Sequence, residues 1–259
     1  MNAIDQHNQL IQKEFTKQAR AYASNPNIKD TDWAMTLVNA VQPVGKERVL
    51  EVATGPGYVA LAFATRSKEV IGLDLTDAPL AIARQNQAER GITNVSFQAG
   101  DANQLPFEDN EFDVVVCRLA VHHFADPRRV LSEMVRVCKP GGKLAVEDLI
   151  ASEHSQKAYF YNYWERLRDP SHVTALSLSQ LLALYTGLGL EAEYVHTQDK
   201  RQVVEQWMKN SQTPLDVAEE IRTLLERDKV ERLSGIPVYT TEEGELCFDH
   251  RMIVVIGRK

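Results

Sequence analysis

Residues 51–58 read EVATGPGY, and this stretch decides the fold that the sequence predicts. The run 48–53 that leads into it has the composition of a buried strand, and Tyr58 opens a run of helix-forming residues. Gly55 and Gly57 stand in the turn between the two, where glycine lets a ligand approach the main chain closely. The stretch therefore predicts a strand, a ligand-binding turn and a helix in succession.

The same alternation continues along the next hundred residues. Helical stretches at 58–65, 77–90 and 126–138 separate five short β-prone runs. The predicted strands are 48–53, 69–74, 95–99, 112–118 and 143–147. Regular alternation favours a parallel sheet with right-handed crossovers and helices on both faces. We therefore expect a doubly wound α/β core.

Helical segments flank this core. Apolar residues at helical spacing predict a helix over 4–22, and a second helix follows the cap-like residues 30–32 and ends before Pro43. After the fifth strand we expect helices at 153–168, 178–187, 203–210 and 215–233 and strands at 191–196, 236–239 and 251–257. No repeat or long linker divides the chain. We expect a single domain over 1–259, with an N-terminal helical cap (1–45), a cofactor-binding core (46–150) and substrate-side insertions with the last strands (151–259).

Composition narrows the classes of function. The chain is 44% hydrophobic and 25% charged, as in ordinary globular proteins, and its net charge of -7 disfavours binding to nucleic acid or anionic membranes. Three cysteines without C-x-x-C spacing predict neither disulfides nor a metal site, which fits a reducing cytoplasm. Residues 1–14 are polar, and no apolar run reaches membrane-spanning length. We expect a cytoplasmic protein without membrane insertion.

Acidic residues follow the second and third predicted strands. Asp74 ends the second strand and can accept both hydroxyls of a ribose, and Asp101 follows the third strand at the same edge of the sheet. Together with the glycine turn they predict a nucleoside pocket. Residues 55–60 also satisfy the G-x-G-x-x-A dinucleotide pattern, so a nicotinamide-dependent oxidoreductase is one alternative. The acidic Glu51 beside the turn and the absence of a Tyr-x-x-x-Lys pair count against it.

Residues 46–150 resemble a class I S-adenosylmethionine-dependent methyltransferase, of the branch that includes the ubiquinone and menaquinone C-methyltransferases. Five segments carry the resemblance in the family's order: 51–57, VIGLD at 70–74, GDA at 100–102 followed by LPF at 105–107, EFDVV at 111–115 and RVCKPGG at 136–142. The resemblance implies a Rossmann-like, seven-stranded sheet whose last strand, 251–257, is antiparallel.

The resemblance also implies S-adenosylmethionine as the cofactor. The loop with Glu51, Gly55 and Gly57 would hold the methionine part of the cofactor. Asp74 with its neighbour Leu75 would bind the ribose, and Asp101 with Ala102 would contact the adenine. Arg118 would line the pocket, and a segment with Phe15, Ala19 and Tyr22 would fold over the cofactor. A sulfonium cation beside Glu51 is electrostatically sensible. Two positions depart from the family: Ala53 replaces its first glycine, and residues 121–124, VHHF, differ from the quinone enzymes, which puts quinone methylation in doubt.

Methyl transfer is an in-line displacement, so the protein must align the acceptor and supply a base where a proton has to leave. His122 and His123, after the fourth strand, are the candidate bases; because neighbours rarely point into one pocket, we expect one to act and the other to pack. Both could also be structural. Glu147 and Asp148 are a second candidate. The aromatic side chains within 159–164 could form a lid over a flat acceptor or simply pack in the core. His172 and Arg201 could contact the acceptor or lie in solvated loops.

Other readings remain beside a small-molecule methyltransferase. Residues 118–121, RLAV, lack the Pro-Pro-aromatic motif of DNA amino-methyltransferases, and the cysteines do not suit an arsenic methyltransferase. A non-catalytic cofactor-binding protein stays an alternative. The acceptor, the acceptor atom (carbon, oxygen, nitrogen or sulfur) and a homodimeric state are left open by the sequence.

Overall fold

The computed structural model describes residues 3–259, with only the backbone at Pro26 and Asn27. Of the polar N-terminal segment 1–14, residues 3–14 are described, and residues 1–2 lie outside the described part. Eight strands form one sheet in the order β3-β2-β1-β4-β5-β8-β6, with the short β7 pairing with β8. The strands are β1 (Arg48–Val52), β2 (Glu69–Asp74), β3 (Val95–Ala99), β4 (Phe112–Arg118), β5 (Cys138–Leu149), β6 (Glu191–Val203), β7 (Val238–Thr240) and β8 (Leu246–Arg258).

The sheet has the predicted doubly wound topology. Strands β1 to β5 pair in parallel, and β8 runs antiparallel between β5 and β6. The expected antiparallel last strand is confirmed. The count of seven strands holds for the main order, and β7 adds an eighth at the side of β8.

Strands β6 and β8 are much longer than predicted. Each has 13 residues, against the expected 191–196 and 251–257. Their additional halves pair with each other from Asp199–Arg251 to Val203–Cys247, beyond the core strands. Charged residues in these halves interrupt the apolar alternation that indicates a strand, which explains why the predicted strands are too short.

Helices cover both faces of the sheet, as expected. Helices α3, α4 and α5 lie on one face, where they enclose a core with Leu37, Phe63 and Val70. Helices α6 and α8 lie on the other face, where Leu131 of α6 and Leu181 of α8 belong to one apolar core with Leu144 of the sheet. The helices are α1 (Ala3–Ser24), α2 (Pro26–Lys29), α3 (Thr31–Val41), α4 (Tyr58–Ala64), α5 (Asp77–Arg90), the 3-10 turn η1 (Val121–His123), α6 (Pro127–Val137), α7 (Ser155–Arg168), α8 (Leu178–Gly187), α9 (Val204–Asn210) and α10 (Leu215–Glu231).

A third core lies beneath the helices that follow β5. We call α7, α9, α10 and β7 the cap. Trp164 of α7 is fully buried and contacts the rings of Trp207 and Phe248 at centroid distances of 5.3 and 5.0 Å. Phe248 belongs to the extended half of β8, so this strand joins the cap to the main sheet.

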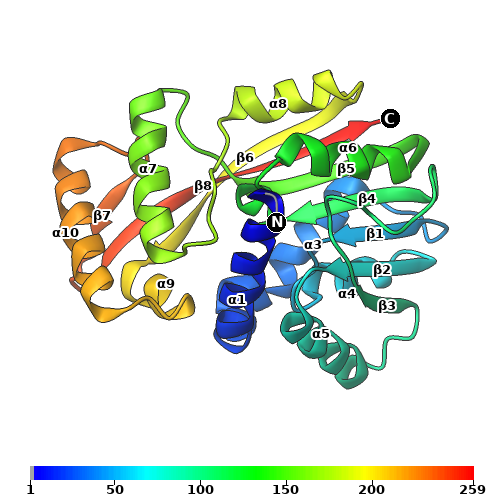
Figure 1. Cartoon of the computed structure of the whole chain (residues 1–259), viewed down its shortest axis with the longest axis horizontal. Coiled ribbons are helices and arrows are strands. Elements are labelled where there is room, and N and C mark those ends of the chain that lie inside the picture. Colours follow the sequence, from blue (N-terminus) through cyan, green and yellow to red (C-terminus); the bar gives the residue numbers. More distant parts are fainter. Residues whose placement is uncertain (1–2) are drawn as a thin grey trace.

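The N-terminal helix α1 lies between the cap and the core (Figure 1). It crosses the ends of the central strands and contacts α5 on the core side and α9 on the cap side. Within residues 3–259, no helix combines the length and the apolar character that crossing a membrane requires.

Candidate active site

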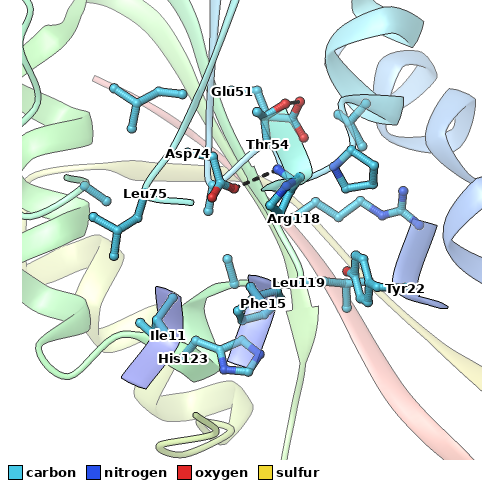
Figure 2. Close-up of a pocket in the computed structure, with 18 of the residues that line it drawn as sticks. Ile11, Phe15, Tyr22, Glu51, Thr54, Asp74, Leu75, Arg118, Leu119 and His123 are labelled. Carbon is cyan, nitrogen blue, oxygen red and sulfur yellow. Dashed lines mark hydrogen bonds between the residues drawn. The ribbon is translucent and has the colours of Figure 1, made fainter. Parts of the chain in front are cut away.

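The glycine turn after β1 is held by two carboxylates, the buried Glu51 and the half-buried Asp74. Glu51 accepts hydrogen bonds from the Thr54 hydroxyl at 2.5 Å and from the Ala60 amide at 2.8 Å. Burial raises the pKa of Glu51 to about 8, although both hydrogen bonds oppose the rise. The Gly55 amide donates to Asp74 Oδ2 at 2.8 Å, the bond drawn in Figure 2. The turn is therefore tied to the ends of both β1 and β2.

Three residues of this turn have a left-handed backbone. Their φ angles are +58° at Ala53, +52° at Gly55 and +79° at Gly57. A Cβ on Gly57 would lie 2.7 Å from Phe97 Cζ and 2.9 Å from Ala83 Cβ, so only glycine fits there. Gly57 does not line the cavity; it lets α4 begin tightly against β3 and α5, whereas Gly55 faces the cavity with open space beside it.

The predicted nucleoside-binding carboxylates lie at the same edge of the sheet. Asp74 accepts from the Gly55 and Thr76 amides, and burial raises its pKa to about 6 against these bonds. Asp101 accepts from Asn8 Nδ2 and from the Asn103 amide, both at 2.8 Å. The bond from Asn8 ties α1 to this edge.

Arg118 is a buried cation with unused donors. It ends β4, is 7% exposed, and stacks on Trp33 with its guanidinium carbon 3.9 Å from the ring centroid. Its Nε is ion-paired with Glu147 Oε2 at 3.3 Å without forming a hydrogen bond, and neither Nε nor Nη2 has a hydrogen-bond partner in the described chain. Buried donors of this kind are costly unless a ligand satisfies them.

These groups surround a cavity of about 1010 Å³, including the space open to solvent. Figure 2 shows Glu51, Thr54 and Asp74 on one side and Ile11, Phe15 and His123 on the other. Eight of the nine predicted cofactor-binding residues line it: Tyr22, Glu51, Gly55, Asp74, Leu75, Asp101, Ala102 and Arg118. The size suits a nucleoside-containing ligand.

A second cavity of about 670 Å³ lies on the cap side. It shares five lining residues with the first: Phe15, Tyr22, Ile28, Leu119 and His123. Its remaining wall combines aromatic and apolar side chains such as Trp33, Trp207 and Met252 with polar ones such as Arg168 and Asp169. Two ligands could thus meet across one shared wall.

Both candidate histidines line this second cavity, so the expectation that only one would face a pocket is wrong. The 3-10 turn η1 presents them side by side, with ring centroids 4.3 Å apart. His122 Nδ1 is hydrogen-bonded to Asp148 Oδ1, and because a carboxylate accepts, Nδ1 carries the proton. His123 Nδ1 donates to the Ser171 carbonyl at 3.0 Å. Each ring therefore keeps its Nε2 as the nitrogen able to accept a proton.

The environments separate the two histidines. Burial alone would lower the pKa of His122, but the charge and hydrogen bond of Asp148 outweigh it and raise the pKa above its usual value. Burial and the neighbouring His122 lower the pKa of His123 to about 4. Asp148 also accepts from the Ala120 and Val121 amides, so it holds η1 in place. His122 is the stronger base, and Asp148 positions it.

Other predicted candidates lie elsewhere. Glu147 accepts from Trp33 Nε1 and lines neither cavity. No aromatic residue of α7 lines either cavity, so the lid alternative is wrong. The packing alternative holds for Tyr161 and Trp164, which are buried in the cap, and not for Tyr159, which is 68% exposed. His172 is buried and bonded to Asn162, and Arg201 is exposed and bonded to Tyr239.

Several lining residues escaped the sequence reasoning. Asn8 and Ile11 follow the same helical face as Phe15 and could have been found from that spacing. Trp33, Arg168 and Trp207 come from three distant elements and share no local signal.

The sheet order, the acidic edge and the glycine turn define a class I methyltransferase architecture. The profile of a family described as a methyltransferase domain matches residues 50–146. The uncharacterized methyltransferase YcgJ of Bacillus subtilis (strain 168) is 32% identical over 246 residues, which cover 95% of this chain and 97% of that protein. Its crystal structure superposes with a TM-score of 0.82, over 87% of this chain and 97% of that one. The chain belongs to the class I S-adenosylmethionine-dependent methyltransferase family.

Two further relatives differ in how far they match. The demethylmenaquinone methyltransferase of Renibacterium salmoninarum is 37% identical, over 45% of this chain and 47% of that protein. A phosphoethanolamine N-methyltransferase from Haemonchus contortus, solved in complex with S-adenosyl-L-methionine, shares the fold at 17% identity and a TM-score of 0.66, over 94% of this chain and 56% of that one. The first relative matches only the core, and the second supports the fold alone.

Proposed function

We propose that this protein transfers the methyl group of S-adenosylmethionine to a small-molecule acceptor bound in the second cavity. Family membership favours methyl transfer over the nicotinamide chemistry that the glycine pattern left open. The observation that carries the proposal is the pair of adjoining cavities, one with nucleoside-binding groups and the other with a carboxylate-held histidine.

The residues of the first cavity fit the cofactor. When bound, S-adenosylmethionine supplies an electrophilic methyl group on a positively charged sulfur. Asp74 would hold the ribose hydroxyls and Asp101 with Ala102 the adenine, and the Arg118 donors that lack a hydrogen-bond partner would bind the methionine carboxylate. Glu51 can balance cationic charge once it is ionised.

The second cavity prepares the acceptor. His122 Nε2 removes the acceptor proton, and Asp148 holds the ring and stabilises the resulting imidazolium. His123 lies at the shared wall with a low pKa and stays neutral. Helix α1 closes both cavities and excludes water from the reacting groups. The negative net charge disfavours a nucleic-acid acceptor, and three buried, unpaired cysteines fit action in the cytoplasm.

Calorimetric titration tests the cofactor. Wild type should bind S-adenosylmethionine and S-adenosylhomocysteine but not NADH, and Asp74→Ala should weaken both by about tenfold to a hundredfold, since charge-assisted bonds contribute about 1.5 to 3 kcal/mol each. Asp77→Ala, at the start of α5 and outside the cavity, is the matched control. Binding of NADH alone would overturn the proposal.

Transfer is tested with S-adenosylmethionine labelled in its methyl group and a panel of small acceptors. We expect His122→Gln to abolish most transfer while cofactor binding persists. Tight cofactor binding without transfer to any acceptor would favour the non-catalytic alternative.

A further inference from the structure

A second histidine–carboxylate pair lies at the cap side of the second cavity. His250, in the extended half of β8, is hydrogen-bonded through Nε2 to Glu165 Oε1 of α7 at 2.7 Å. Glu165 is fully buried, and His250, 7% exposed, lines the cavity. Burial would raise the pKa of Glu165, but His250 and Arg168 outweigh burial and lower it below its usual value, so the carboxyl is ionised and accepts the bond. The proposed transfer step does not use this pair.

The pair leaves one nitrogen of His250 able to accept a hydrogen bond. Because the carboxylate accepts, Nε2 carries the proton, and the neutral ring keeps the lone pair of Nδ1. Within the described residues, no group is hydrogen-bonded to Nδ1. A ligand in the second cavity that carries a donor can therefore bind to this nitrogen.

The other histidines of the second cavity are held in the same way. His122 donates to Asp148 and His123 donates to a main-chain carbonyl, so each of them also keeps one nitrogen that accepts. The two charged residues of the cavity wall, Arg168 and Asp169, have opposite signs and lie 4.0 Å apart. The wall thus combines several hydrogen-bond acceptors with a balanced pair of charges, which suits an uncharged ligand that carries more than one donor.

We propose that His250 binds the acceptor, and that the acceptor is a neutral small molecule with hydroxyl or amino groups at two positions. One of these groups lies at His122 and receives the methyl group, and the other donates to Nδ1 of His250. Glu165 is a positioning residue, because it acts on the acceptor only by fixing the tautomer of His250. The inference rests on the proposed function, since it takes the ligand of the second cavity to be the methyl acceptor.

The two contacts orient the acceptor across the cavity. His122 belongs to η1 at the end of the core strands, whereas the His250 ring lies beneath the cap, 6.3 and 6.5 Å from the rings of Tyr161 and Trp207 between centroids. A molecule held at both ends presents one chosen group to the cofactor, and a molecule with a single donor can bind in either direction.

Binding of dihydric phenols tests the two-donor ligand. The probes are catechol, resorcinol and hydroquinone, whose hydroxyls lie at increasing separations, and phenol is the one-donor reference. NMR titrations are made under nitrogen at pH 8, above the ordinary histidine pKa of about 6.5, with and without S-adenosylhomocysteine. At least one dihydric phenol should bind wild type about threefold to tenfold more tightly than phenol, as one added hydrogen bond allows. His250→Phe keeps a ring without nitrogens and should remove this preference, whereas His154→Phe, exposed and outside both cavities, should retain it.

Glu165→Gln tests the tautomer and keeps the imidazole ring. The amide oxygen should stay toward the Arg168 guanidinium, whose Nε lies 3.5 Å from Glu165 Oε2, so the amide NH₂ turns toward His250. Nε2 then accepts, the proton moves to Nδ1, and Nδ1 no longer accepts from a ligand. ¹⁵N NMR of histidine-labelled protein should show the exchanged tautomer, and the preference for two hydroxyls should disappear. A merely structural role of Glu165 would not change the tautomer.

The outcomes separate this inference from the proposed function. Circular dichroism establishes that each variant is folded. If phenol binds wild type as tightly as all three dihydric phenols, or if both His250→Phe and Glu165→Gln keep the preference, the inference is overturned. A protein that does not bind S-adenosylhomocysteine overturns the proposed function instead, and the phenol comparison without that ligand still decides the role of His250. With an acceptor from the labelled-methyl panel, His250→Phe should raise KM whereas His122→Gln lowers kcat, and an unchanged KM overturns the inference.

Discussion

Replacing Glu51 by glutamine should remove a loss of stability that the wild type undergoes as pH rises. The pKa of Glu51 is about 8 in the folded protein against 4.5 as the ordinary value. Between these pH values the folded state holds a proton that the unfolded state has lost, so the stability of the wild type falls as pH rises from about 4.5 to about 8. At 1.36 kcal/mol per unit, the 3.5-unit difference amounts to about 5 kcal/mol.

Glutamine is neutral at every pH and can still accept the bonds from Thr54 and Ala60. Urea unfolding at intervals from pH 5 to 9 measures the free energy of unfolding of both proteins. As pH rises over this range, the free energy of unfolding of the variant should increase relative to that of the wild type by several kcal/mol. Glu133→Gln is a control without pH dependence in this range: its hydrogen bond to Arg136 lowers the pKa of Glu133, so the carboxyl is ionised in the folded and the unfolded state from pH 5 to 9, and the stability difference from the wild type should stay constant. Parallel stability curves for wild type and Glu51→Gln would refute the reasoning.

The same change should alter cofactor binding. If a cationic ligand ionises Glu51, wild type releases protons on binding at neutral pH, and the variant releases fewer. Titrations in buffers of different ionisation enthalpy measure the proton count. An unchanged count would show that Glu51 keeps its proton in the complex.

Four further expectations follow from the geometry. Arg118→Gln should weaken binding of S-adenosylhomocysteine by about tenfold to a hundredfold but leave 5′-methylthioadenosine, which lacks the carboxylate, unaffected in calorimetry; equal losses for both ligands would contradict the assignment. Asp148→Asn should lower the pKa of His122, seen by NMR, so that the acidic limb of the transfer rate moves to lower pH while the maximal rate falls. Ala53→Gly should stabilise the protein by about 1 kcal/mol in urea unfolding by relieving a left-handed alanine, whereas Gly57→Ala should destabilise it because its Cβ meets Phe97. Trp164→Ala should cost about 3 to 5 kcal/mol by thermal or urea unfolding, with cofactor affinity retained because the residue lines neither cavity.

The residues of the first cavity could be predicted because their signals are local in the chain. Glu51 and Gly55 are neighbours in one turn, and Asp74 and Asp101 each end or follow a strand whose position the alternating pattern fixes. Parallel strands then bring these residues to one edge.

The arrangement of the second cavity could be seen only in three dimensions. His122 and Asp148 lie 26 residues apart and meet because β4 and β5 are aligned, with Arg118 opposite Glu147. That register decides which histidine is bonded to Asp148, and no single-strand pattern contains it. The extended halves of β6 and β8 carry charged residues, so the sequence pattern did not predict the long two-stranded ribbon that supports the cap.

Helix α1 has a kinetic consequence. It walls both cavities and is attached to the core largely by side-chain bonds, from His7 to the His123 carbonyl, Asn8 to Asp101 and Gln12 to the Leu75 carbonyl. It contributes no strand to the sheet, so a movement of α1 would leave every strand pairing intact. If the protein transfers a methyl group as proposed, both reactants would enter and both products would leave past α1, and the rate at which α1 moves would then set the upper limit on turnover.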